Sequence, residues 1–94
     1  MGKNELPSTS RSRQPETELA RRLVAEADRR GWTISDFARH AQEQSDEMGQ
    51  RRTITIQQAH RWLTVARSLS GRNRDLLCEL LGVSAEYLTP EVDL

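Results

Sequence analysis

Apolar residues recur every three or four positions along most of this chain, which is the spacing of one face of an α-helix. In the first such stretch Leu19, Leu23 and Ala27 stand four residues apart, and Gly31 follows as a residue that ends helices. No run alternates apolar and polar residues in the way that strands do. The pattern therefore predicts an all-α fold that begins with a helix over about residues 16–30.

The second predicted helix has two start signals. Thr33 stands three residues before Asp36, the pattern of a capping box, in which each side chain bonds the other residue's backbone N–H. Trp32 and Phe37 occupy the two positions of a hydrophobic staple, a contact that fixes how the chain enters the helix. We expect this helix to continue to about residue 48, before Gly49 ends it.

Two further helices are predicted after a polar stretch. Thr55 is the expected N-cap of the third helix, with Gln58 as its reciprocal partner. Its residues at core-facing spacing are Ala59, Trp62, Leu63 and Ala66. The fourth helix is predicted to start near Ser70 and to end at Gly82. Its expected buried residues are Leu76, Leu77, Leu80 and Leu81, together with Cys78.

The two ends of the chain are predicted to differ in structure. Ser84 is the expected cap of a short fifth helix over residues 85–88, which Pro90 prevents from extending. Residues 1–15 hold one leucine beyond the initiator methionine and cannot bury a core, so we expect a flexible arm. The prediction is therefore one helical domain, residues 16–94, preceded by a disordered N-terminal arm.

Several classes of protein are disfavoured by composition. No stretch is apolar enough for a membrane span or a signal-peptide core, so we expect a cytoplasmic protein. The single cysteine, Cys78, and the two histidines, His40 and His60, do not form a metal-binding cluster, and no metal or cofactor is predicted. No nucleophile–base pair or phosphate-binding glycine loop is present, which argues against an enzyme.

Charge is segregated, although the whole chain sums to zero. Residues 51–74 contain no acidic residue and six arginines: Arg51, Arg52, Arg61, Arg67, Arg72 and Arg74. Residues 75–94 contain five acidic residues and no basic one. A local positive potential attracts a polyanion even when the net charge is zero. The alternative is that these arginines lie on an ordinary solvated helix surface.

Three segments in order resemble the lambda-repressor-like, or XRE-type, helix-turn-helix domains. Residues 81–88, Leu-Gly-Val-Ser-Ala-Glu-Tyr-Leu, are similar to the closing segment of that family. Residues 31–38 resemble its entry into the first motif helix, and residues 54–62 resemble its recognition helix, with Trp62 at the usual core aromatic position. The resemblance implies a compact five-helix bundle whose third helix lies in the major groove of DNA.

The resemblance also implies which side chains contact DNA. The residues that match base-reading positions are Ile56, Gln57, Gln58 and Arg61. The residues expected at phosphates are Thr33, Thr55, His60, Arg51, Arg52, Arg67, Arg72 and Arg74. Arg11 and Arg13, in the N-terminal arm, are candidates for the minor groove. For the glutamines and Arg61 the alternative is an exposed polar face without a partner.

The chain departs from the family pattern between its two motif helices. Ala38 and Ile54 are 16 residues apart, whereas the family has about five between the matching positions. Either the second helix lengthens, or residues 44–52 form a loop. The acidic Asp46 and Glu47 of this insertion could obstruct DNA or bind a protein. The glycine that usually follows the core aromatic is also missing, which favours a longer third helix.

The sequence thus favours a sequence-specific transcriptional regulator, most simply a homodimeric repressor of phage, plasmid or mobile-element type on a palindromic operator. The candidate dimer interface is Tyr87, Leu88 and Val92, and the alternative for these residues is packing within the domain. The alternative function is an antitoxin or adaptor on the same scaffold, which binds a toxin or another regulator through the flexible arm or the acidic end.

Overall fold

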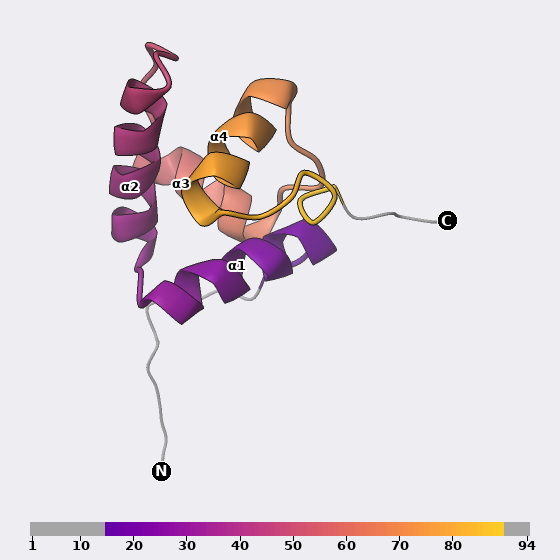
Figure 1. Ribbon diagram of the computed structural model, residues 1–94. Coiled ribbons are helices and arrows are strands. Elements are labelled where there is room, and N and C mark those ends of the chain that lie inside the picture. The colour runs from indigo at the N-terminus through magenta and orange to yellow at the C-terminus, as the bar shows by residue number, and fades with distance from the viewer. Residues whose placement is uncertain (1–14, 90–94) are drawn as a thin grey trace.

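The computed structural model describes residues 15–89, in which four α-helices and no strand are present. The helices are α1 (Glu18–Arg30), α2 (Ile34–Glu47), α3 (Ile56–Thr64) and α4 (Gly71–Leu81). Figure 1 shows α3 crossing behind α2 and running above α1, with α4 in front of it. The predicted all-α class is confirmed. Val92 and residues 1–14 of the predicted N-terminal arm, including Arg11 and Arg13, lie outside the described residues.

Every helix begins at a serine or threonine whose hydroxyl accepts a backbone N–H three residues later, as expected for N-caps. The four caps are Thr17, Thr33, Thr55 and Ser70. Thr33 and Asp36 form the predicted capping box, whereas at α3 only the threonine half of the predicted pair is present. The backbone N–H of Thr33 and the Arg39 guanidinium hold the pKa of Asp36 below its ordinary value.

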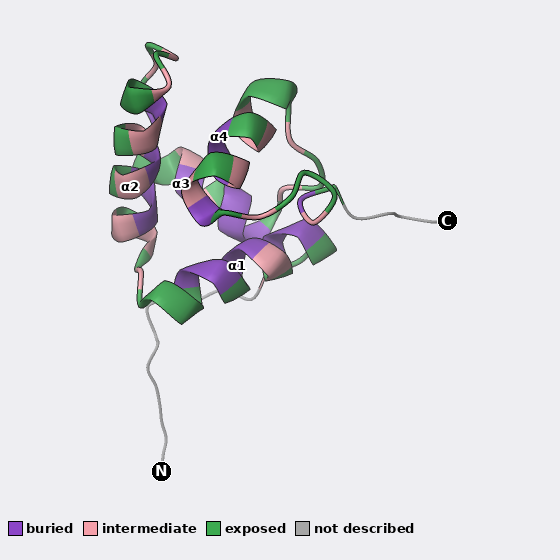
Figure 2. Cartoon of the chain, viewed as in Figure 1, coloured by how far each residue is buried: buried purple, intermediate pink, exposed green. Residues whose placement is uncertain are grey.

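The core lies where the four helices meet. Trp32 packs edge-on against Phe37 at 5.9 Å between ring centroids, which is the contact that the staple pattern predicts. Phe37 in turn lies 6.2 Å from Trp62, which links α2 to α3. Figure 2 shows that the buried residues of α1 and α2 lie on the sides facing α3 and α4. Ala59, Trp62 and Leu63 are buried as predicted, while Ala66 and Cys78 are only partly buried.

The predicted fifth helix is wrong, because residues 84–89 form overlapping turns instead. The backbone N–H groups of Tyr87, Leu88 and Thr89 bond the carbonyls three residues earlier, at 3.1 to 3.2 Å. An α-helix requires bonds to the carbonyl four residues earlier. Only five residues separate Ser84 from Pro90, which has no N–H to continue such a ladder, so one turn cannot propagate.

The expectation of a longer third helix is also wrong, because α3 ends at Thr64. The backbone N–H of Glu16 bonds the Thr64 carbonyl at 2.7 Å, and the Thr17 hydroxyl donates to the Ala66 carbonyl. Carbonyls that would otherwise accept the next turn of the helix are therefore used by the chain that enters α1. This contact spans 49 residues, so no local pattern could have predicted it.

The insertion between the motif helices combines both of the arrangements considered above. α2 lengthens to Glu47, and Gly49 then adopts φ 72°, a left-handed conformation that glycine tolerates and that closes the helix. The chain turns back, and the Gln42 side chain holds the returning segment by two bonds. Its amide nitrogen donates to the Arg52 carbonyl at 2.9 Å, and its oxygen accepts the Ile54 N–H at 2.7 Å. We call residues 42–54 the inserted hairpin.

Candidate nucleic-acid interface

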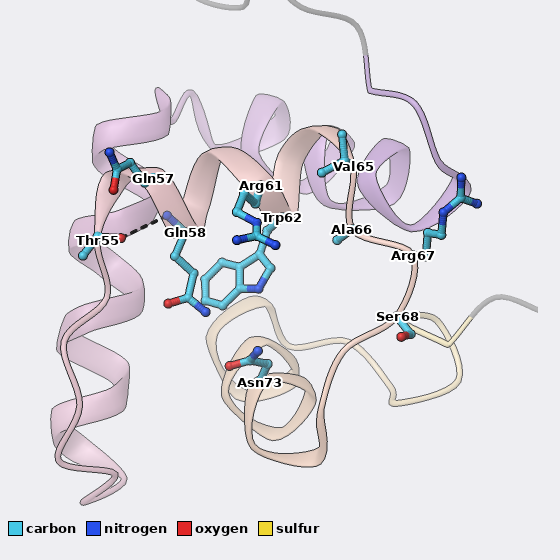
Figure 3. Close-up of a pocket in the computed structure, with 10 residues that line it drawn as sticks. All are labelled: Thr55, Gln57, Gln58, Arg61, Trp62, Val65, Ala66, Arg67, Ser68 and Asn73. Atoms are coloured by element: carbon cyan, nitrogen blue, oxygen red, sulfur yellow. Dashed lines mark hydrogen bonds between the residues drawn. The ribbon is translucent and has the colours of Figure 1, made fainter.

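The outer face of α3 borders a hollow of about 710 Å³. Figure 3 shows that the wall of the hollow comes from three segments: the outer face of α3, the turn after it and the first turn of α4. Its polar lining includes Gln57, Gln58, Arg61, Arg67, Ser68 and Asn73. The hollow is thus an open, polar concavity beside the predicted recognition helix.

The helical period separates the two faces of α3. Ala59, Trp62 and Leu63 point into the core, which leaves Gln57 and Arg61 exposed and Gln58 partly buried. In Figure 3 Gln58 and Arg61 extend from the helix near the indole of Trp62, and Asn73 lies opposite them on α4. Three of the four residues predicted to read bases are therefore neighbours at this hollow.

Two apolar side chains are unusually exposed, and they stand at opposite ends of α3. Ile56, the first residue of the helix, is 56% exposed, and Val65, the residue after its last turn, is 44% exposed. Val65 also lines the hollow. Exposed β-branched residues on a reading helix suit contact with the methyl group of thymine. Ile56 is among the residues predicted to read bases, whereas Val65 is not.

Asn73 was also missed, and it lies opposite the predicted reading residues. Its backbone N–H is used by the Ser70 cap at 3.3 Å, whereas its side-chain oxygen is buried and accepts no hydrogen bond within residues 15–89. A buried acceptor without a donor costs free energy, which a donor from a bound partner would offset. The signal in the sequence was only its place at the third position of a capped helix, which is too common to single it out.

The arginines of the molecule fall into two groups. Those of α1 and α2 are paired with carboxylates: Arg21 and Arg22 with Glu18, Arg29 and Arg30 with Glu26, and Arg39 with Asp36. We call these the paired arginines. In the part of the chain that the structure describes, no ion pair is formed by any of the other group: Arg51, Arg52, Arg61, Arg67, Arg72 and Arg74. We call these the unpaired arginines.

The inserted hairpin brings Arg52 to the first turn of α4, a position that sequence reasoning had left open. The side-chain oxygen of Gln50 accepts from Arg52 at 3.3 Å, and its amide nitrogen donates to the Arg72 carbonyl at 3.3 Å. The Arg72 guanidinium donates in turn to the Gln50 carbonyl at 2.8 Å. Partial burial and the nearby charge of Arg72 lower the pKa of Arg52.

The remaining predicted phosphate residues are more dispersed. Thr33 and Thr55 are exposed at the N-caps of α2 and α3, where each hydroxyl accepts a backbone N–H. His60 is partly buried, and its carbonyl accepts the Thr64 hydroxyl at 2.6 Å. Arg67 is exposed in the turn after α3, and Arg74 is partly buried on α4. Of these, Thr55 and Arg67 line the hollow.

The C-terminal turn is held by its own chain. Leu88 is 1% exposed and belongs to the core, so for this residue the packing alternative is the one observed. Arg22 donates to the Tyr87 carbonyl at 2.7 Å, and its guanidinium lies 5.1 Å from the centre of the Tyr87 ring. Burial and the neighbouring Glu26 raise the pKa of Tyr87, which stays partly exposed.

No described helix is long and apolar enough to cross a bilayer, and the described residues hold no cluster of three metal-ligating side chains. No protein-family model matches the chain, and no curated protein and no solved structure matches it either.

Proposed function

We propose that this protein is a sequence-specific DNA-binding regulator of the XRE-type helix-turn-helix kind, which reads the major groove with the outer face of α3. The observation that carries the proposal is the separation of the arginines. The paired arginines lie on α1 and α2, whereas the unpaired arginines lie on or around the inserted hairpin, α3 and the start of α4. Unneutralised guanidinium groups gathered in one stretch of a neutral chain suit a polyanionic partner.

The dimensions and chemistry of α3 support the same proposal. The helix has nine residues, and its diameter with side chains, about 10 to 12 Å, is close to the width of the major groove. Arginine binds guanine and glutamine binds adenine through two hydrogen bonds each, so Arg61 and Gln57 have the side chains that base edges require. Gln58 and Ile56 complete the proposed reading surface.

The other unpaired arginines would contact phosphates. Arg67 follows α3 directly, and Arg51, Arg52 and Arg72 flank its N-terminal side through the inserted hairpin and α4. Such contacts contribute affinity without reading sequence. Because a single module of this size covers little DNA, the proposed active form is a homodimer on a palindromic site, acting as a repressor. Tyr87 is partly exposed, so a second copy could contact it.

A second candidate function, a protein-binding adaptor or antitoxin, is favoured by one observation. Glu43 and Glu47 are exposed along α2 with Asp46 beside them, so the inserted hairpin carries acidic groups next to its arginines. Such a surface also suits a basic protein partner. An adaptor of this kind would form a stable complex with its partner and bind DNA weakly, without sequence preference.

The experiment that separates the two is selection of bound sites from random double-stranded DNA at two salt concentrations. DNA reading predicts one enriched motif at both concentrations, with two-fold symmetry if the protein binds as a dimer. The variant to compare with wild type is Arg61→Ala. It is expected to lose the preference at one base position of each half-site. Failure to enrich any motif at either salt concentration would reject the proposal.

A further inference from the structure

The inserted hairpin and α4 hold two guanidinium groups close together. Gln50 contacts Arg72 through two hydrogen bonds across 22 residues of chain, and it accepts a third from Arg52. The side-chain oxygen, the side-chain nitrogen and the backbone carbonyl of Gln50 all take part. The positions of both arginines are therefore set by one glutamine rather than by a carboxylate.

The arrangement leaves two like charges side by side. The chain contains as many acidic as basic residues, yet neither Arg52 nor Arg72 forms an ion pair within residues 15–89. Partial burial lowers the pKa of Arg52, and the nearby charge of Arg72 lowers it further. An anion placed between the two groups would remove this repulsion. A guanidinium has several N–H donors in one plane, and each of these two commits only one of its terminal nitrogens to Gln50.

The backbone that presents Arg52 is fixed in an unusual conformation. Arg51 has φ 56°, in the left-handed region that residues other than glycine seldom occupy. Two features of the hairpin maintain this conformation. Gly49 ends α2 in a left-handed conformation, and the Gln42 side chain donates to the carbonyl of Arg52. A strained residue persists where its surroundings over-determine it, which is typical of sites built to bind. The backbone at Arg52 is thus held by its neighbours, and Gln50 accepts one hydrogen bond from each guanidinium group.

Each arginine of the pair is also close in sequence to a residue that lines the hollow beside α3. Arg72 directly precedes Asn73, which lines the hollow under α3, and Arg52 stands three residues before the Thr55 cap. With α3 in the major groove, the residues before its first turn face one of the two sugar–phosphate strands that border the groove. A phosphodiester on that strand is the anion that this position would meet.

We infer that Arg52 and Arg72, held together by Gln50, form a clamp for one DNA backbone phosphate at the flank of the site read by α3. The inserted hairpin then extends the contact with DNA instead of obstructing it. This inference rests on the proposed function, but it concerns a different group of residues from those that read bases. It assigns a role to the insertion that interrupts the motif.

The test compares affinities for the duplex selected by the wild-type protein, measured by fluorescence anisotropy over a range of salt concentrations. R52Q/R72Q is expected to weaken binding about tenfold and to reduce the slope of log K against log salt by about one. The DNA motif that R52Q/R72Q selects is expected to be that of the wild-type protein. The matched control is R21Q/R39Q, which removes two exposed arginines that are paired on α1 and α2, and its slope is expected to stay at the wild-type value.

A second duplex, shortened until its ends stop at the bases that α3 reads, locates the phosphate. On this duplex wild type and R52Q/R72Q are expected to bind equally, because the clamped phosphate is missing. An equal loss on both duplexes, or an unchanged slope on the long one, would overturn the clamp while leaving base reading intact. Binding of the wild-type protein to no selected duplex at all would instead reject the proposed function itself.

Arg52 is partly buried, so the double variant must be shown to fold. R72Q alone changes an exposed side chain and provides the second variant. It is expected to lose part of the affinity and of the slope at an unchanged melting temperature. An R72Q protein that melts like wild type and binds the long duplex like wild type would overturn the clamp.

Discussion

The paired arginines of α1 and α2 and the unpaired arginines between Arg51 and Arg74 have the same chemistry and opposite surroundings. Arg22 and Arg30 reach from α1 to backbone carbonyls of Tyr87 and Leu81, so the first group joins distant parts of the fold. The second group contacts no carboxylate within the described residues. The charge of the first group is thus neutralised within the fold, and we propose that the charge of the second group binds a partner.

The sharpest test on the stability side is Glu26→Ala. Glu26 is 3% exposed and accepts from both Arg29 and Arg30, so its loss leaves two guanidinium groups without their carboxylate. We expect unfolding in denaturant to show a loss of about 2 kcal/mol, with little change in DNA affinity for the protein that remains folded. Glu43→Ala, an exposed site on α2, is the control and should lose far less. A stable Glu26→Ala protein would contradict the structural role of the paired group.

On the binding side, Arg61→Ala should show the opposite result. Arg61 is exposed and unpaired, so its removal should leave the melting temperature unchanged. Affinity for the selected duplex is expected to fall roughly tenfold to a hundredfold, with relaxed preference at one base position. Arg21→Ala, in the paired group, is the matched control and should retain both affinity and preference. A uniform loss across all sequences would assign Arg61 to a phosphate.

The inserted hairpin follows the paired arginines in the chain and contains two of the unpaired ones. Gln42→Ala tests whether the Gln42 side chain holds the returning segment of this hairpin. The substitution removes both bonds that hold the returning segment, at Arg52 and at Ile54. We expect a loss of about 1 to 2 kcal/mol in stability and much faster hydrogen exchange of the Ile54 amide. DNA affinity should fall less than in the R52Q/R72Q variant. Exchange of this amide at the wild-type rate would show that the hairpin is held by other contacts.

The smallest expected effect is on pH dependence. The hydrogen bond from Arg22 holds the pKa of Glu18 below its ordinary value of 4.5. A carboxylate with a lowered pKa stabilises the fold above its unfolded pKa, and that contribution is lost as the pH falls through the folded one. In the Glu18→Gln protein the melting temperature should therefore fall slightly less than in wild type as the pH is lowered below about 4.5. An identical acid profile would show that this exposed pair contributes nothing.

Sequence patterns predicted correctly the features that neighbouring residues determine, such as the ends of helices. Thr33 with Asp36, and Gly31 and Gly82 in left-handed conformations, lie where capping rules place helix ends. The exposed face of α3 followed from helical periodicity in the same way. The features that sequence reasoning got wrong or missed depend on contacts between distant residues. The end of α3 depends on Thr17, and the position of Arg52 depends on Gln50 and on the start of α4.

The central claim is that the unpaired arginines bind DNA and the paired ones do not. The most direct measurement is the salt dependence of affinity for the selected duplex in two matched variants, R61Q/R67Q and R21Q/R39Q. Each removes two exposed arginines and the same charge. We predict that R61Q/R67Q binds far more weakly, with a slope reduced by about one to two, while R21Q/R39Q binds like wild type. Equal losses in the two variants, or no loss in either, would contradict the account.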